Sequence, residues 1–206
     1  MSPRPPLIAA YVLSCPDREQ VRARTLANLA ATDWDEEPRV VVDETSCDRR
    51  QERQEETTLR LLLLAIDDDS PFVLFLEDDL EFNRHLRHNL ERWPPIEDAG
   101  GDHFFASLYN PAVLAKRRYP ERACFVAEAD CVYGSQAIIL SRAMVCFASA
   151  RWRDVPGMQD IKLSRLAAPL CPLLYHSPSL VQHVGVASTW GGSYHQAIDY
   201  DADWRA

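Results

Sequence analysis

Short apolar runs alternate along this chain with longer segments in which apolar residues recur every three or four positions. The short runs predict strands over residues 7–13, 40–43, 72–76, 104–108, 134–140, 173–175 and 180–183. The longer periodic segments predict helices over residues 16–30, 48–66, 83–93, 141–150 and 158–166. The basic stretch 109–121 is expected to be irregular, and the two prolines at 94 and 95 are expected to end the third helix.

The first five elements follow the order strand, helix, strand, helix, strand. This order favours parallel strands joined by right-handed crossovers, while the less regular second half favours a mixed sheet. We therefore expect an α/β fold whose mixed, mainly parallel central sheet is flanked by helices. The chain contains no internal repeat and no linker, so residues 1–206 are expected to form one domain.

Composition restricts the function classes. Apolar residues make up 47% and charged residues 26% of the chain, as in a soluble protein with a true core. The net charge of −9 argues against nucleic-acid binding. The longest aliphatic run, residues 61–66, is too short for a membrane span. Six cysteines without C-x-x-C spacing and an N-terminus without a signal-peptide pattern favour a cytoplasmic protein.

The strongest chemical signal is the apolar run 72–76, which leads directly into Glu77, Asp78 and Asp79. Carboxylates at the end of a buried strand lie at the sheet edge where α/β proteins bind ligands. Three adjacent carboxylates repel one another and need a compensating charge, which a divalent cation with oxygen ligands supplies. We expect Asp79 to bind that cation; a solvated acidic turn is the alternative.

Two further residues carry candidate chemistry. His183 ends a short apolar run and precedes a glycine; it is either a structural histidine or a ligand, and an imidazole beside carboxylates favours Mn²⁺. Asp160 stands at a predicted helix start. It is either a helix cap or a general base that removes a proton from an acceptor hydroxyl.

Several polar turns follow the predicted strands and could contact a nucleotide or a sugar. Arg18 is expected near a phosphate or a base, and Asp43 near a nucleobase or ribose. Small residues after Tyr133 would let a sugar approach the backbone closely. Ordinary turns are the alternative at each place. The candidate donor-binding residues are Ser14, Arg18, Asp43, Glu77, Asp78, Gly134, Ser135 and Gln136.

Taken together, these segments resemble glycosyltransferases of the GT-A fold. Leu76-Glu77-Asp78-Asp79 takes the place of the DxD motif and recurs in family 25 lipopolysaccharide glycosyltransferases. The segment 178–185 is similar to the C-terminal motif of the family IV N-acetylglucosaminyltransferases. The pairing of these two distant segments carries most of the resemblance.

The resemblance implies a transferase that uses a nucleotide-diphosphate sugar, with UDP as the expected nucleotide, a hydroxyl acceptor, and Mn²⁺ or Mg²⁺. By the same resemblance Asp79 and His183 bind the metal, Glu77 and Asp78 face the ribose or donor sugar, and Asp160 is the base of an inverting reaction. It also divides the chain into a nucleotide-binding half, about residues 1–110, and an acceptor-binding and metal-completing half, about residues 111–206.

Two other functions compete with this interpretation. A metal-dependent nucleotidyltransferase or phosphohydrolase would need more acids or histidines around two metal ions. A non-catalytic protein that binds sugar nucleotides on a transferase scaffold would keep the donor site without turnover.

Overall fold

A large mixed sheet forms the centre of the protein. The computed structural model describes residues 7–111, 115–128, 132–185 and 195–206. Within these residues eight strands join in the order β2-β1-β3-β8-β5-β9-β7-β6. Their bounds are β1 Ile8–Ser14, β2 Arg39–Val42, β3 Phe72–Leu76, β5 Phe105–Ser107, β6 Ala115–Tyr119, β7 Cys124–Ala127, β8 Ala137–Ser141 and β9 Leu173–His176.

Strand directions make this sheet mixed but mainly parallel. The neighbours β2, β1 and β3 are parallel, as are β5 and β9, whereas β8 and β7 run antiparallel to the strands beside them. Six of the eight strands described in this central sheet therefore point the same way. This confirms the expected α/β fold with a mixed, mainly parallel sheet. Strand β8 lies between β3 and β5, so the two halves of the chain share one sheet.

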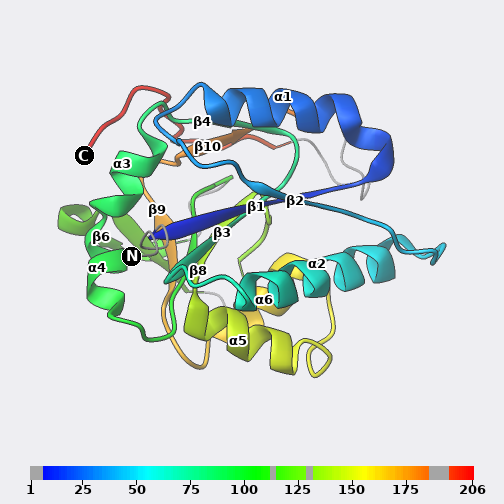
Figure 1. Cartoon of the computed structure of the whole chain (residues 1–206). Helices are drawn as coiled ribbons and strands as arrows, with labels where there is room; N and C mark the ends of the chain where they lie inside the picture. The colour runs from blue at the N-terminus through cyan, green and yellow to red at the C-terminus, as the bar shows by residue number, and fades with distance from the viewer. Residues whose placement is uncertain (1–6, 112–114, 129–131, 186–194) are drawn as a thin grey trace, which may run out of the picture.

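Helices cover both faces of the sheet. Figure 1 shows α1 and a two-stranded sheet of β4 and β10 on one face, and α2, α5 and α6 on the other. The remaining bounds are η1 Pro16–Arg18, α1 Glu19–Ala30, α2 Arg50–Ile66, β4 Leu80–Phe82, α3 Leu86–Glu91, α4 Pro94–Ala99, η2 Pro120–Arg122, α5 Arg142–Arg151, α6 Gln159–Ala167 and β10 Val181–His183. No helix of the described residues combines the length and hydrophobicity of a membrane span.

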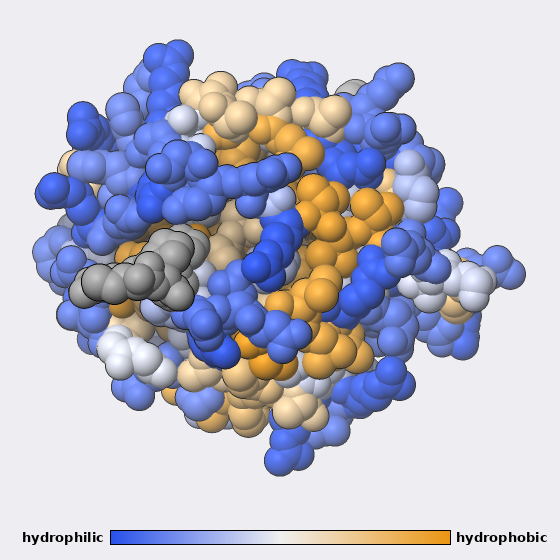
Figure 2. Space-filling model, in the orientation of Figure 1, coloured by the Kyte–Doolittle hydropathy of each residue, from blue (hydrophilic) through white to orange (hydrophobic). Residues whose placement is uncertain are grey.

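Alternate side chains of the central strands enter two separate cores. On β3, Leu74 and Leu76 face the core beneath α1, whereas Val73 and Phe75 face the core beneath α2 and α5. Each fully buried aliphatic or aromatic side chain contributes about 1.5–3 kcal/mol to folding. Figure 2 shows the molecule in the orientation of Figure 1: this face is mainly hydrophilic, with apolar residues along its middle.

Local structure differs from the sequence-based predictions at three places. Ala115–Tyr119 is not irregular but forms β6, because a strand at the sheet edge can keep charged side chains such as Arg117 and Arg118 exposed. The third helix ends before the two prolines, as expected, but Pro94–Ala99 then forms the unexpected helix α4, because prolines lose no hydrogen bond in a first turn. The strand β4 was not expected, since only its pairing with the distant β10 makes it a strand.

Candidate active site

The three acids after β3 lie at the edge of the sheet where β1, β2 and β3 all end. A cavity of about 230 Å³ opens at this edge. Its walls come from the ends of β1, β2 and β3, the turn η1, one face of α2 and the start of α6. The lining residues are Leu13, Ser14, Cys15, Asp17, Arg18, Asp43, Arg50, Arg53, Gln54, Thr57, Glu77, Asp78 and Gln159.

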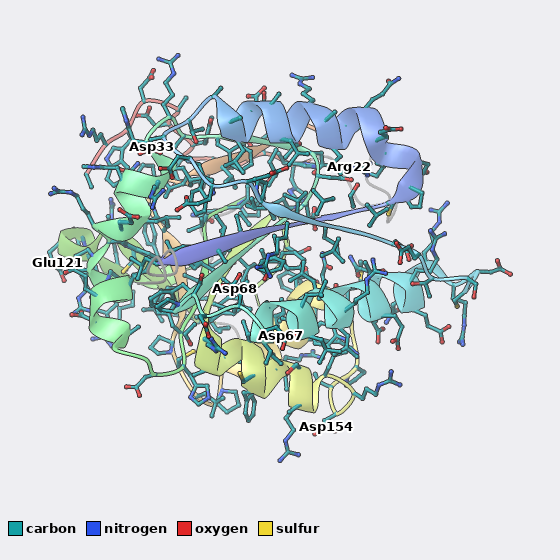
Figure 3. The ribbon with its side chains drawn as sticks, viewed as in Figure 1. Arg22, Asp33, Asp67, Asp68, Glu121 and Asp154 are labelled. Atoms are coloured by element: carbon teal, nitrogen blue, oxygen red, sulfur yellow. The ribbon has the colours of Figure 1, made fainter. Side chains whose placement is uncertain are left out.

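Arg18 supplies positive charge to two of the three acids. Its Nη2 lies 2.8 Å from Asp78 Oδ1 and 2.7 Å from Asp79 Oδ2. Ser14 Oγ donates to Asp78 Oδ2 at 2.5 Å and accepts from Arg22 Nη1 at 2.9 Å. Burial alone would lower the pKa of Arg18, but the hydrogen bonds and charges of the two aspartates outweigh it and raise that pKa. Figure 3 shows Arg22 on α1; sequence reasoning did not find it.

Asp79 and His183 meet although they lie far apart in the sequence. His183 Nε2 is 3.2 Å from Asp79 Oδ2, because β10 pairs antiparallel with β4 and aligns His183 with Leu80. Burial opposes ionisation of both groups. Even so, the hydrogen bond and charge that they share raise the pKa of His183, and together with Arg18 they lower the pKa of Asp79.

The pair fits a divalent cation on two observations. Asp79 Oδ1 is buried and has no hydrogen-bond partner among the described residues, which is costly unless a ligand satisfies it. A Cβ at Gly185 would lie 2.5 Å from Asp79 Oδ2 and 2.7 Å from His183 Nε2, so only glycine leaves room beside these atoms. The described residues contain no cluster of three or more potential metal ligands. Two protein ligands suit Mg²⁺ or Mn²⁺, which commonly take further oxygens from substrate phosphates and water.

Glu77 belongs to a buried polar network that sequence reasoning found only in part. Ser135 Oγ donates to Glu77 Oε1, and Gln159 Nε2 donates to the same oxygen at 3.1 Å. Thr58 Oγ1 donates to Gln159 Oε1 at 2.7 Å, which ties α2 to α6. Burial, followed by the charge of Asp79, raises the pKa of Glu77 to about 7. Gln159 and Thr58 had no distinctive signal in the sequence.

Asp160 begins α6 beside this network but does not line the cavity. Its Oδ2 accepts the backbone N–H of Gly134 at 2.8 Å, and its Oδ1 accepts that of Ile161 at 2.9 Å. Gly134 has a φ of 93°, a left-handed conformation that glycine adopts readily. The carboxylate is therefore fixed in orientation and joins α6 to the turn before β8. Gln136, in that turn, is buried, and its Oε1 has no partner among the described residues.

Asp43 connects β2 with the wall formed by α2. Its Oδ2 accepts from Arg53 Nε at 2.6 Å, and its Oδ1 accepts from Thr45 N–H at 2.9 Å and Thr57 Oγ1 at 3.1 Å. Burial would raise the pKa of Asp43, but these hydrogen bonds lower it. Four α2 residues line the cavity at positions i, i+3, i+4 and i+7, namely Arg50, Arg53, Gln54 and Thr57. This helical spacing was a signal that could have revealed the α2 wall.

Comparisons with known proteins establish the fold. No protein-family model and no curated sequence matches the chain. Among solved structures, S. aureus TarS 1–349, crystallised with UDP-GlcNAc, has a TM-score of 0.53 at 12% identity, covering 84% of this chain and 57% of TarS. The galactosyltransferase LgtC, crystallised with donor and acceptor sugar analogs, has a TM-score of 0.50 at 15% identity, covering 88% of this chain and 89% of LgtC. A197 from STIV has a TM-score of 0.50 at 13% identity, covering 96% and 97%.

The chain therefore has the GT-A glycosyltransferase fold. It spans little more than half of the TarS fragment that it matches. At these identities the likeness concerns the fold alone, so the two particular families suggested by the motifs stay predictions.

Proposed function

We propose that this protein is a glycosyltransferase that moves a sugar from a UDP-linked donor to a hydroxyl acceptor in the presence of Mn²⁺ or Mg²⁺. The observation that carries the proposal is the convergence of Asp79 and His183 beside the cavity, at the ligand-binding edge of a GT-A sheet. The crystallisation of TarS with UDP-GlcNAc supports the choice of donor class.

The proposed donor lies along the cavity, with its nucleoside toward Asp43 and the α2 wall and its diphosphate toward Asp79 and His183. A metal ion held by these two side chains would supply the positive charge that stabilises the departing diphosphate. The guanidinium of Arg18 would add a second positive charge near the diphosphate, since its Nη2 lies 2.7 Å from Asp79 Oδ2. Glu77 and Asp78, with the turn of Gly134, Ser135 and Gln136, would contact ribose and donor-sugar hydroxyls.

Asp160 is the proposed base. In the reaction, the bond between the anomeric carbon and the diphosphate oxygen breaks, and the acceptor oxygen forms the new bond to that carbon. The acceptor proton passes to a carboxylate oxygen of Asp160, which has an unused lone pair beside its backbone hydrogen bond. Attack opposite to the leaving group would invert the anomeric configuration.

One observation favours a second candidate, a sugar-nucleotide-binding protein without turnover. Both oxygens of Asp160 already accept backbone N–H groups, as expected of a purely structural cap. A two-metal nucleotidyltransferase or phosphohydrolase has less support, because the described residues hold no cluster of three or more potential metal ligands.

The test combines donor binding with product analysis. Melting temperatures are measured with a panel of nucleotide sugars, with and without Mn²⁺; a bound donor raises the melting temperature by mass action. The best donor is then incubated with a panel of sugar and alcohol acceptors, and products are identified by mass spectrometry. We expect a new glycoside and free UDP. A donor that binds with no glycoside from any acceptor supports the non-catalytic candidate, and nucleotidyl products would contradict the proposal.

A further inference from the structure

His195 and Tyr109 form a hydrogen-bonded pair directly beside His183, and neither was expected from the sequence. Tyr109 lies two residues beyond β5 and is fully buried. Its hydroxyl oxygen is 2.9 Å from the backbone carbonyl oxygen of His195 and 2.7 Å from His195 Nδ1. The rings of His195 and His183 lie with their centroids 5.6 Å apart.

The directions of these hydrogen bonds follow from which groups can donate. A backbone carbonyl can only accept, so the single hydroxyl proton of Tyr109 points to the carbonyl of His195. The phenol oxygen then accepts from His195 Nδ1–H, which specifies one tautomer of that ring.

The same carbonyl also faces His183. His183 Nδ1 lies 3.3 Å from the carbonyl oxygen of His195, and again only the ring N–H can be the donor. This contact keeps a proton on Nδ1 and directs Nε2 toward Asp79 Oδ2, 3.2 Å away. A divalent cation bound by these two atoms would take the place of the Nε2 proton in their hydrogen bond. Histidines that bind metals through one ring nitrogen commonly donate the other N–H to a carbonyl or carboxylate, which fixes tautomer and ring orientation.

We propose that Tyr109 and His195 are positioning residues that hold the His183 ring with Nε2 available to a divalent cation shared with Asp79. The inference rests on the proposed metal-dependent function. Tyr109 anchors residue 195 through both its carbonyl and its ring, and the anchored carbonyl orients His183. The pair acts through His183.

The first test measures Mn²⁺ affinity of the full chain by electron paramagnetic resonance of free Mn²⁺. Tyr109→Phe removes one oxygen from a buried ring and should weaken Mn²⁺ binding about 10-fold. His195→Phe removes only the ring contact, leaves the carbonyl in place, and should weaken binding less. Tyr11→Phe is the matched control, because Tyr11 is equally buried but its hydroxyl contacts Arg39 and Asp68; its Mn²⁺ affinity should equal that of the wild type.

Nitrogen NMR of the His183 ring in the metal-free protein provides a second readout. We expect the Nδ1–H proton of His183 to exchange slowly with water in the wild type and in Tyr11→Phe, and to exchange faster in Tyr109→Phe, because the carbonyl of residue 195 is then no longer held beside it. The positioning role is overturned if Tyr109→Phe keeps the wild-type exchange rate and Mn²⁺ affinity, or if Tyr11→Phe loses affinity equally. The exchange measurement needs neither metal nor turnover. A wild-type protein that fails to transfer sugar would therefore contradict the proposed function, while the exchange rates would still decide the positioning role.

Discussion

Two acidic triplets flank the same strand, and they differ in nearly every physical respect. Residues 67–69 precede β3, and Asp67 and Asp68 lie between the end of α2 and the start of that strand (Figure 3). Asp67 and Asp69 are exposed. Asp68 accepts hydrogen bonds from Ser70 N–H at 3.0 Å and Ser70 Oγ at 2.8 Å, and pairs with Arg39 at 3.3 Å. Both carboxylate oxygens of Asp68 therefore have partners, Ser70 beside it in the chain and Arg39 and Tyr11 on the neighbouring strands.

The triplet after β3, Glu77 to Asp79, depends on distant elements. Its partners come from η1, the turn before β8, α6 and β10, and one oxygen of Asp79 has no partner among the described residues. Buried carboxylates cost free energy unless they are paired, so the unpartnered oxygen of Asp79 supports the proposed metal site. The comparison shows that two clusters of similar acidic composition differ in burial and in partners because they lie at opposite ends of one strand.

The largest expected effect comes from exchanging a carboxylate for an amide in each triplet. Asp79→Asn should lower the rate of sugar transfer at least about 100-fold, because it removes charge that holds the metal beside the leaving group. Asp68→Asn should leave the rate within about 2-fold, since Asp68 lies at the other end of β3. Initial rates at saturating donor measure both. Equal losses would show that the two triplets do not differ in function.

The next prediction separates the base from the donor site. Asp160→Asn should lower the transfer rate about 100-fold while donor and Mn²⁺ affinities stay unchanged, because only proton transfer is lost. Asp154→Asn, which alters an exposed pair with Arg151, is the control and should have wild-type rates. Isothermal titration supplies the affinities. If Asp160→Asn transfers sugar at the wild-type rate, Asp160 is only a cap.

A smaller effect is expected from filling the space beside the Asp79–His183 pair. Gly185→Ala would place a methyl group within 2.7 Å of both side chains and push them apart. We expect Mn²⁺ affinity to fall about 10-fold, the loss typical when residues that orient the metal ligands are changed. Mn²⁺ titration measures it, and the melting temperature shows whether the fold is intact. Undiminished affinity in a folded variant would mean that these atoms do not hold the metal.

The smallest effect concerns the stability contributed by the satisfied triplet. Burial would raise the pKa of Asp68, but the hydrogen bonds of Ser70 and Tyr11 and the charge of Arg39 lower it below the ordinary value of an aspartate. A lowered pKa stabilises the fold above the unfolded pKa, and this contribution disappears as the pH falls through the folded value. Asp68→Asn should therefore cost about 1 kcal/mol at neutral pH, a modest amount because water screens the site. Urea unfolding should show the two proteins converge in strongly acidic solution.

Local patterns were sufficient for much of the fold. The strands β1 and β3 and the helix α2 follow from unbroken apolar runs and helical spacing, and the cap Ser141 of α5 accepts from Met144 N–H as its position suggests. The edge strand β6 could not be recognised, because its charged residues carry no alternation that distinguishes a strand from a loop. β4 is three residues long and exists through its pairing with β10.

The candidate site was predictable where residues follow strand ends, and not where they depend on packing. Asp43 and Glu77 to Asp79 could be located because the carboxyl ends of parallel strands share one edge. The contact of Arg18 with Asp78 and Asp79 could not be foreseen, since the guanidinium was equally placed to meet a phosphate. No sequence pattern marks Tyr109, because its proposed role depends on a hydrogen bond to His195, which is distant in the sequence.

The sequence by itself determined the α/β class, the parallel order of the first strands and the acidic end of β3, because these depend on short-range apolar patterns and chain connectivity. Only the tertiary structure decided which groups share an oxygen: Arg18 and His183 on Asp79 Oδ2, and Gln159 and Ser135 on Glu77. Such contacts depend on positions set to within an ångström by the packing of whole elements, which no local run of residues records.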